Sequence, residues 1–418
     1  MYTISYFKDL ISQAGDGAVA NWQQLAAYLS SPEGGQFRII DGTDIYQNYA
    51  IVRYDKGISN MTLPYSRWLR SVVWDKTKCL PVCVAPPKAS AAETFNQEIL
   101  QTTVCEEFLD GVMINVFGVV GSDAEPVVCT RSSLGAAGNF YSQRPFSSLL
   151  KDALTASNWT IKDLLPAGEE GRTVFASVLL QHPEHRIVES VAVPRIFIIH
   201  QGIVADDGTV VIDESQSKAP RLGCELSFAD LPRWLGQKAE ELGWTWQGVV
   251  FKDGKGGRWR MRAAPYRLVR SLRGITSRSD VRFAYLRQQN LLESYLYYYP
   301  EDLTLYMQYE MRIEKIKQEI YDTYVAVYIT KVLSYDHISP AVKAILYNLH
   351  GYYLNVLRPV KKYIKKTDVG LLLGALNWQQ LLRLLLESIS HSPPFTMEIQ
   401  RRRSRVTDVI LTANADHV

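Results

Sequence analysis

An arginine-rich stretch, Arg258 to Arg273, is the part of the sequence best suited to bind a charged ligand, with six arginines and no acidic residue. Guanidinium groups donate paired hydrogen bonds to phosphate oxygens, and aromatic rings stack on bases. Trp259 and Tyr266 stand among these arginines, which favours a phosphate-binding strand and helix with stacking surfaces. The alternative is the solvated basic face of a surface helix, which explains the same residues without a ligand.

A second group that could do chemistry is the histidine pair of the segment His182-Pro-Glu-His185. Imidazole is a common metal ligand, and two histidines three positions apart superficially suit a metal ion. The neighbouring sequence holds no third ligand motif, so we interpret the segment as a polar turn between strands and expect no metal site.

The cysteines do not form a framework. All five are scattered and make no Cys-x-x-Cys pair: Cys79, Cys83, Cys105, Cys129 and Cys224. A disulfide scaffold or a structural zinc site is therefore not expected, and a reducing, cytoplasmic compartment fits best. The first residues lack a basic region leading into an apolar stretch, and no apolar run of about 18 residues occurs, so we expect neither secretion nor a membrane span.

Length and composition indicate a multidomain globular chain. The sequence has 418 residues, of which 21% are charged and 47% hydrophobic. Single hydrophobic cores usually stop growing near about 250 residues, so two or three domains are expected. The formal net charge of +3 is too small to indicate a nucleic-acid partner by itself.

The elements that would position the arginines change in kind along the chain. Residues 1–36 have apolar residues at helical spacing and predict a helical lead-in. Short β-branched runs follow from residue 37 to 130, then a helix at 144–156, strands at 174–180 and 186–200, a helix at 229–242 and a strand at 248–251. Because strands and helices do not alternate strictly, the segment 37–278 predicts an α+β domain.

The C-terminal third of the sequence has a helical pattern in place of the strand pattern. Helical periodicity dominates residues 305–332, 340–356 and 370–389, so an all-helical domain is expected at 279–392. The remaining segment, 393–418, holds four arginines between Arg401 and Arg405 and is expected to be a basic tail. Such a tail could serve as a localisation signal, a nucleic-acid arm or a contact to an acidic partner, and the sequence leaves these open.

Five motifs follow one another between residues 37 and 275. They are Arg70 to Asp75 with Val82 to Lys88; Glu106-Glu-Phe-Leu-Asp-Gly111; Thr130-Arg-Ser-Ser-Leu-Gly135; Arg186 to Val188 with Val193 to His200; and Gln247-Gly-Val-Val250 with Arg258 to Arg262 and Tyr266. In this order they resemble the nucleotidyltransferase domain of RNA ligases, especially the phage-type RNA ligase 1 branch. The resemblance implies antiparallel, ATP-grasp-like sheets, and it implies nucleotide- or phosphate-binding roles for Arg70, Glu106, Asp110, Gly111, Arg131, Gln247, Arg260 and Arg262.

The residues nearest the reaction depart from that family. Members attack the α-phosphate of ATP with a lysine, and Phe108 stands at the lysine position. Gln247 replaces the acid that helps to hold the metal, and an amide binds a hard cation more weakly than a carboxylate. The closing Lys-x-Lys reads Arg260-x-Arg262, which keeps the charge and changes its geometry. The chemistry implied by the resemblance is therefore expected to be lost.

A displaced nucleophile is the alternative. Lys88 follows a Pro-Pro turn, and Lys56 lies in Asp55-Lys-Gly57, but neither has the Asp-Gly context of the family motif. A solvated or phosphate-contacting role is the better interpretation of both lysines. The enzyme hypothesis, an ATP-dependent RNA or DNA ligase using ATP and Mg²⁺, would need one of them as the nucleophile.

We therefore expect a degenerate RNA-ligase-like protein that binds nucleic acid or serves in an assembly, with no cofactor. The helical domain and the basic tail would contact RNA or other proteins. The chain is also similar to ligase-like proteins of large DNA viruses. That similarity implies a place in the host cytoplasm or, as a structural component, in a virion.

Overall fold

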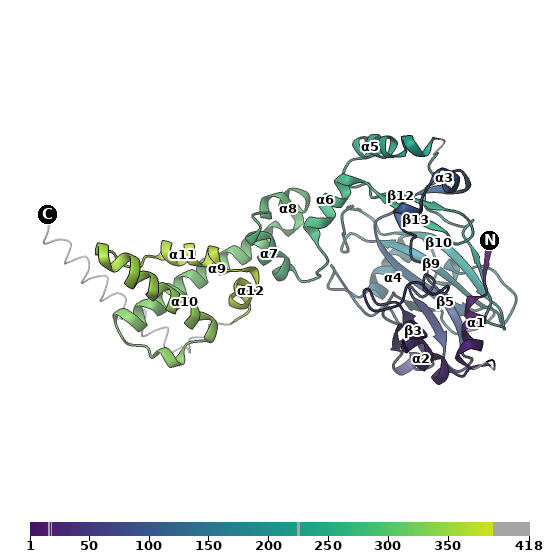
Figure 1. Cartoon of the computed structure of the whole chain (residues 1–418), viewed down its shortest axis with the longest axis horizontal. Helices are drawn as coiled ribbons and strands as arrows, with labels where there is room; N and C mark the ends of the chain where they lie inside the picture. Colours follow the sequence, from purple (N-terminus) through teal and green to yellow (C-terminus); the bar gives the residue numbers. More distant parts are fainter. Residues whose placement is uncertain (16, 18, 224–225, 388–418) are drawn as a thin grey trace. The chain divides into compact units, whose positions relative to one another are not determined.

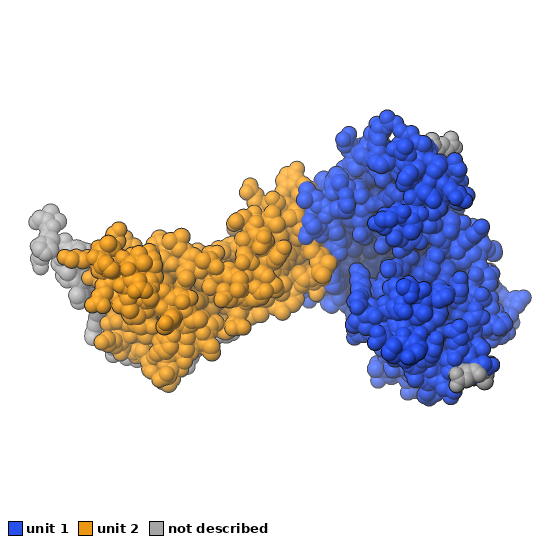
Figure 2. Space-filling model, in the orientation of Figure 1, with its two compact units in different colours: residues 1–271 blue, residues 272–418 orange. Residues whose placement is uncertain are grey.

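The protein has two compact units, Met1–Ser271 and Leu272–Val418 (Figure 2). The structure is a computed structural model and describes residues 1–15, 17, 19–223 and 226–387. The prediction of an α+β domain followed by a helical region is confirmed. The predicted basic tail and Cys224 lie outside the described residues. No helix of the described segments is long and apolar enough to cross a membrane.

Unit 1 is built from three sheets, in which neighbouring strands run antiparallel (Figure 1). The strands are β1 (Tyr2–Ile4), β2 (Arg38–Asp41), β3 (Tyr49–Arg53), β4 (Val72–Asp75), β5 (Leu80–Val84), β6 (Val104–Glu107), β7 (Val112–Val119), β8 (Val127–Cys129), β9 (Thr173–Gln181), β10 (Arg195–Val204), β11 (Val210–Asp213), β12 (Gly248–Lys252) and β13 (Arg258–Arg262). The sheets have the orders β1-β11-β10-β9-β7-β8, β2-β3-β4-β5 and β13-β12-β6.

The six-stranded sheet buries both of its faces. The helices that begin in unit 1 are α1 (Tyr6–Ala14), α2 (Trp22–Ser30), α3 (Gln97–Thr102), α4 (Phe146–Ala156), α5 (Leu231–Leu242) and α6 (Ala264–Arg273). Ile114 and Val116 of β7 belong to a core shared with α4, whereas Phe117 belongs to a core shared with α1, α2 and the four-stranded sheet. This alternation with period two is what a strand between two layers requires.

Two sequence predictions in unit 1 are wrong in part. Residues 2–4, expected to be helical, form β1, because Ile4 is buried and the segment pairs with β11. Residues 186–194, expected to continue a strand, form a turn, and β10 begins only at Arg195. The physical reason is that the backbone N–H groups of Val188 and Glu189 donate to the carboxylate of Asp110 instead of to a neighbouring strand.

Unit 2 contains α7 (Ser279–Gln288), α8 (Leu292–Tyr298), α9 (Leu303–Tyr324), α10 (Pro340–Tyr352), α11 (Lys366–Ala375) and α12 (Trp378–Leu386). The helix predicted at 370–389 is two helices. Asn377 caps α12 in a reciprocal capping box with Gln380, and this start signal ends the preceding helix. The helices predicted at 305–332 and 340–356 each end in a π-helical turn, at Val325–Ile329 and Tyr353–Leu357.

Candidate phosphate-binding pocket

A pocket of about 250 Å³ lies in unit 1 beside the three-stranded sheet β13-β12-β6. In that sheet Val250 is paired with Glu106 on one side and with Arg260 on the other, so the ends of three distant segments come together. Gly248 opens β12 with a φ of 127°, and a Cβ there would lie 2.0 Å from the carbonyl oxygen of Met261. Only glycine permits this close pairing of the two strands.

Eight residues singled out from the sequence line this pocket: Arg70, Glu106, Phe108, Asp110, Gly111, Gln247, Arg260 and Arg262. These eight residues come from three of the five motifs, and Ile187 and Ile199 of a fourth motif also line the pocket. Arg131, Lys88 and Lys56 do not line it. The binding roles that the resemblance implied for these residues stay predictions.

Phe108 follows β6 and presents its ring to two arginines of β13. The guanidinium carbons of Arg262 and Arg260 lie 5.2 Å and 5.7 Å from the ring centroid. A cation over an aromatic face is attracted by the ring quadrupole. Phe108 thus holds cations in the pocket, and its side chain carries no group that could attack a phosphate.

Asp110 and Gly111 hold the fold of the pocket together. The Asp110 carboxylate accepts hydrogen bonds from the backbone N–H groups of Val188 and Glu189, at 2.8 Å and 3.0 Å, and from the Tyr266 hydroxyl at 2.8 Å. A Cβ at Gly111 would lie 2.6 Å from the carbonyl oxygen of Leu180, so the close approach of the two backbones requires glycine.

Lys252, which sequence reasoning missed, lies in the pocket and is 4% exposed. Its Nζ is 2.7 Å from a carboxylate oxygen of Glu106, and the same oxygen accepts a hydrogen bond from Ser217. A buried charge of this kind is tolerated only when it is paired. The signal in the sequence was a lysine at the end of the apolar strand Gly248-Val-Val-Phe-Lys252, which indicates a buried partner.

The residues present do not fit a hard metal ion such as Mg²⁺. Gln247 offers an amide, and the orientation that satisfies it donates to the carbonyl oxygen of Leu109 and accepts from Nε of Arg262, both at 3.2 Å. The carboxylates of Glu106 and Asp110 already have partners. Burial, with a further contribution from Glu189, raises the pKa of Glu107, which disfavours the charged form that a metal would need.

Arginine dominates the electrostatics of the pocket. Arg258 is 8% exposed, and its Nε and Nη1 atoms have no hydrogen-bond partner among the described residues. Burial lowers the pKa of Arg258, and burial together with the positive charge of Arg262 lowers the pKa of Arg260. Burial, followed by the charge of Arg258, lowers the pKa of Arg70 to about 10. For Arg258 the nearby charges of Glu214 and Glu106 act in the opposite direction, so an external anion would add to a compensation that is only partial among the described residues.

Arg131 and Lys88 gather around Tyr54 and are not among the residues that line the pocket. The Arg131 guanidinium carbon lies 4.7 Å from the Tyr54 ring centroid, and Lys88 Nζ lies 5.9 Å from it. Lys56 is exposed in the turn that follows Tyr54. Neither of the two lysines suggested as displaced nucleophiles lines the pocket.

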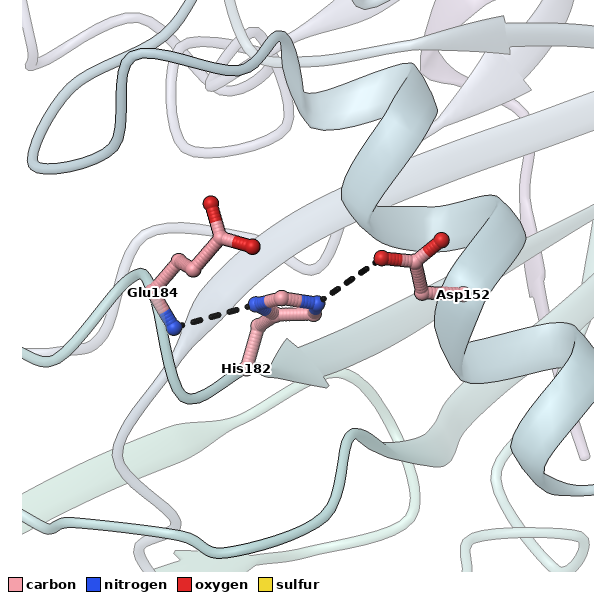
Figure 3. A group of neighbouring side chains, drawn as sticks. All are labelled: Asp152, His182 and Glu184. Carbon is pink, nitrogen blue, oxygen red and sulfur yellow. Dashed lines mark hydrogen bonds and ion pairs between the residues drawn. The ribbon is translucent and has the colours of Figure 1, made fainter.

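In the fold, the turn that contains His182 and His185 lies beside residues from a distant part of the sequence. Asp152 of α4 points toward His182, and Glu184 lies in the turn after β9 (Figure 3). The additional acid, Asp152, comes from a distant segment, helix α4, and not from the sequence next to the histidines. The Arg144 guanidinium already pairs with both acids, at 2.7 Å and 2.9 Å, and His182 accepts from the Glu184 N–H through Nδ1. The group is thus an ion-pair cluster in which one guanidinium serves two carboxylates.

Comparison with known proteins gives a similarity in structure. No family model matches the chain, and no curated protein matches it. Among solved structures it is similar to one described as an archaeal ATP-dependent RNA ligase, form 2, with 11% sequence identity and a TM-score of 0.38, over 71% of this chain and 73% of that chain. At this level of identity, function has to be argued from the residues of the pocket.

Proposed function

We propose that unit 1 is a catalytically degenerate, RNA-ligase-like nucleotidyltransferase domain whose pocket binds a phosphate-bearing ligand without forming a covalent adenylate. The ligand would be a nucleotide or the phosphate end of a nucleic acid. The observation that carries the proposal is Phe108, which stands where the family has its lysine and packs against Arg260 and Arg262. In this proposal the positive charges of Arg260 and Arg262 take the place of the family's cationic residues, and the nucleophilic lysine is lost.

The preference for phosphate follows from the donors of Arg258. Two of its nitrogen atoms are buried without a partner among the described residues. An unsatisfied buried donor is costly, and a charged one more so. A phosphate group, with several acceptor oxygens and a negative charge, would satisfy such donors. Trp259, which neighbours Arg258, donates its own indole N–H to Thr94 and is buried, so it serves packing and is no free stacking surface.

Lys252 is the lysine that the enzyme hypothesis would have to use, because it lines the pocket. Its Nζ is 2.7 Å from Glu106, in an ion pair, and an ammonium ion has no lone pair with which to attack phosphorus. We therefore propose a structural role for Lys252. Neither ATP nor Mg²⁺ is needed as a cofactor in this proposal.

The test combines covalent labelling with equilibrium binding. Purified protein is incubated with ATP labelled at the α-phosphate and Mg²⁺, and a denaturing gel is expected to show no labelled protein. Calorimetry with ATP or pyrophosphate is expected to show binding that Arg260→Gln weakens and that Arg267→Gln, on the exposed side of α6, leaves unchanged. A label that maps to Lys252, Lys88 or Lys56 would establish the enzyme hypothesis instead.

An assembly role is the second candidate, favoured by an apolar groove of about 400 Å³ in unit 2. Exposed Leu303, Met307 and Met311 contribute to it, and large exposed apolar side chains in one place are typical of interaction sites. A place in a virus particle would be one form of such a role. Light scattering of the purified protein would then detect a stoichiometric complex or a defined oligomer, and Met307→Glu would abolish it.

A further inference from the structure

A second group of cations surrounds Tyr54, at the end of strand β3. Nη1 of Arg53 and Nη2 of Arg131 both approach the carbonyl oxygen of Tyr54, at 3.4 Å and 3.3 Å. Lys88 adds a third cation over the Tyr54 ring. Two guanidinium groups thus share one neutral acceptor, and like charges held this close repel each other.

The charge of these two arginines is only partly compensated within the described residues, where Asp55 acts to raise the pKa of Arg53. Neither makes an ion pair with an acidic side chain of the described residues, and Nε of each is buried without a hydrogen-bond partner there. Asp55, the nearest acid along the chain, pairs with Arg38 at 3.8 Å. Burial, and after it the charge of Arg131, lowers the pKa of Arg53. The arrangement leaves donors and positive charge for an external anion.

Arg70 connects this group to the pocket. It lines the pocket, and its pKa is affected by the charges of Arg258, Arg260 and Arg131, so it lies near all three. Arg260 is in turn near Tyr54. The cations therefore continue from the pocket, past Arg70, to Tyr54. One small anion would satisfy one end of this series, whereas a chain of phosphates would satisfy both.

We infer that Arg53, Arg131 and Lys88 form a second anion subsite, which takes an internal phosphodiester of a nucleic-acid strand whose terminal phosphate lies in the pocket. This inference rests on the proposed function, because it places the end of the strand at Arg258 and Arg260. It narrows the ligand class from a phosphate-bearing molecule to a strand with several phosphates. The planar guanidinium groups suit phosphate oxygens, and Tyr54, buried under them, sets their position.

The experiment measures binding of a fluorescent single-stranded RNA of about 12 nucleotides with a 5′-phosphate, within the usual range of strand-binding sites. Arg53→Gln combined with Lys88→Gln is expected to weaken strand binding about tenfold or more, as lost charged hydrogen bonds do. The slope of log affinity against log salt should become shallower by about 0.7 for each lost phosphate contact. Binding of pyrophosphate to the pocket, measured by calorimetry, should not change.

Lys56→Gln is the matched control, because it removes an exposed positive charge from the turn after Tyr54 without touching the subsite. Lys88→Gln alone, at an exposed side chain, guards against a variant that fails to fold. The inference is overturned if the double variant binds the strand as well as the wild type, if Lys56→Gln weakens binding equally, or if anionic lipid vesicles compete as well as unlabelled strand does.

The failure of the proposed function would look different. In that case Arg260→Gln would change neither pyrophosphate nor strand binding, while the double variant at Arg53 and Lys88 would still weaken the strand. That outcome would contradict the placement of the terminal phosphate in the pocket and overturn the two-site inference in this form. Loss of strand binding in both variants, with pyrophosphate binding lost only in Arg260→Gln, supports both proposals.

Discussion

The guanidinium carbon of Arg262 lies 5.2 Å from the centroid of the Phe108 ring. Arg260 approaches the same ring at 5.7 Å, so a single aromatic side chain faces two positive charges. The ring quadrupole offsets part of their mutual repulsion, and Phe108 therefore stabilises a cationic wall that would otherwise spread apart. An apolar residue at this position serves the electrostatics of the pocket as well as filling space.

Replacing Phe108 by Leu should keep an apolar side chain and remove the quadrupole. We expect the free energy of unfolding to fall by about 1 kcal/mol, the usual worth of a cation–π contact at a partly exposed site. Urea unfolding followed by tryptophan fluorescence measures the change. Phe108→Tyr, which keeps the ring face, is the control and should match the wild type. Equal stability of the leucine variant and the wild type would contradict the role assigned to the ring.

The buried ion pair of Lys252 and Glu106 gives a second prediction. Lys252→Met leaves the Glu106 carboxylate without its ammonium partner, and loss of one member of a buried pair typically costs about 3–5 kcal/mol. The double variant Lys252→Met, Glu106→Gln should be more stable than the single variant, because the unpaired charge is gone. A double-mutant cycle in urea measures this coupling, and strictly additive effects would show that the two side chains do not act as a pair.

His200 should make the stability of unit 1 depend on pH. Burial, partly offset by a hydrogen bond to the carbonyl oxygen of Val84, lowers the pKa of His200 to about 3. The unfolded chain has the ordinary pKa near 6.5, so below that pH it binds a proton that the folded protein does not. Above about pH 6.5 His200 is neutral in both states, and the free energy of unfolding has its full value. As pH falls from 6.5 toward the pKa of the folded protein, the free energy of unfolding decreases by about 1.4 kcal/mol per pH unit.

The measurement compares urea unfolding of the wild type and His200→Gln between neutral and acid pH. Glutamine keeps a donor for Val84 and does not titrate, so the difference in unfolding free energy between the two proteins should change with pH in this window. If the free energy of unfolding changed with pH equally in the two proteins, the lowered pKa assigned to His200 would be contradicted. Both proteins share the other acidic groups, whose effects cancel in the difference.

Arg144 is predicted to exclude metal from the group around His182. Its guanidinium holds Asp152 and Glu184, and Arg144→Ala would leave both acids beside the imidazole. Zn²⁺ can replace a proton on histidine and accepts carboxylate ligands. We expect Zn²⁺ to raise the melting temperature of the variant at neutral pH and to leave the wild type unchanged. Lys151→Ala, an exposed neighbour on α4, is the control.

Local patterns in the sequence predicted much of the fold. Short β-branched and apolar runs identified most strands of unit 1, and helical periodicity identified unit 2. The failures in unit 1 share one physical cause, which is pairing between distant segments. Residues 186–194 have the composition of a strand, but their backbone donors go to Asp110, from a segment far away in sequence. The two-helix break at Asn377 was readable from its capping box and was overlooked.

The candidate site, like the fold, was predicted only in part from the sequence. Motif order brought eight residues to one pocket, but it could not show that Lys252 faces Glu106, because side-chain direction depends on the register of β12 with β6. Nor could it show that Arg258 is the most deeply buried arginine of strand β13. Arg53 approaches the Tyr54 carbonyl oxygen together with Arg131, but it belongs to none of the five sequence motifs.

Asp110 and Gly111 have structural roles that do not depend on catalysis. The carboxylate is needed to tie down the 188–189 turn and the Tyr266 hydroxyl, and the glycine is needed because the Leu180 carbonyl oxygen leaves no room for a side chain. Both demands belong to folding. Replacing either residue would therefore disturb the way this part of unit 1 folds, whatever the pocket binds. Asp-Gly in this position is explained by the architecture alone and does not by itself indicate a reaction.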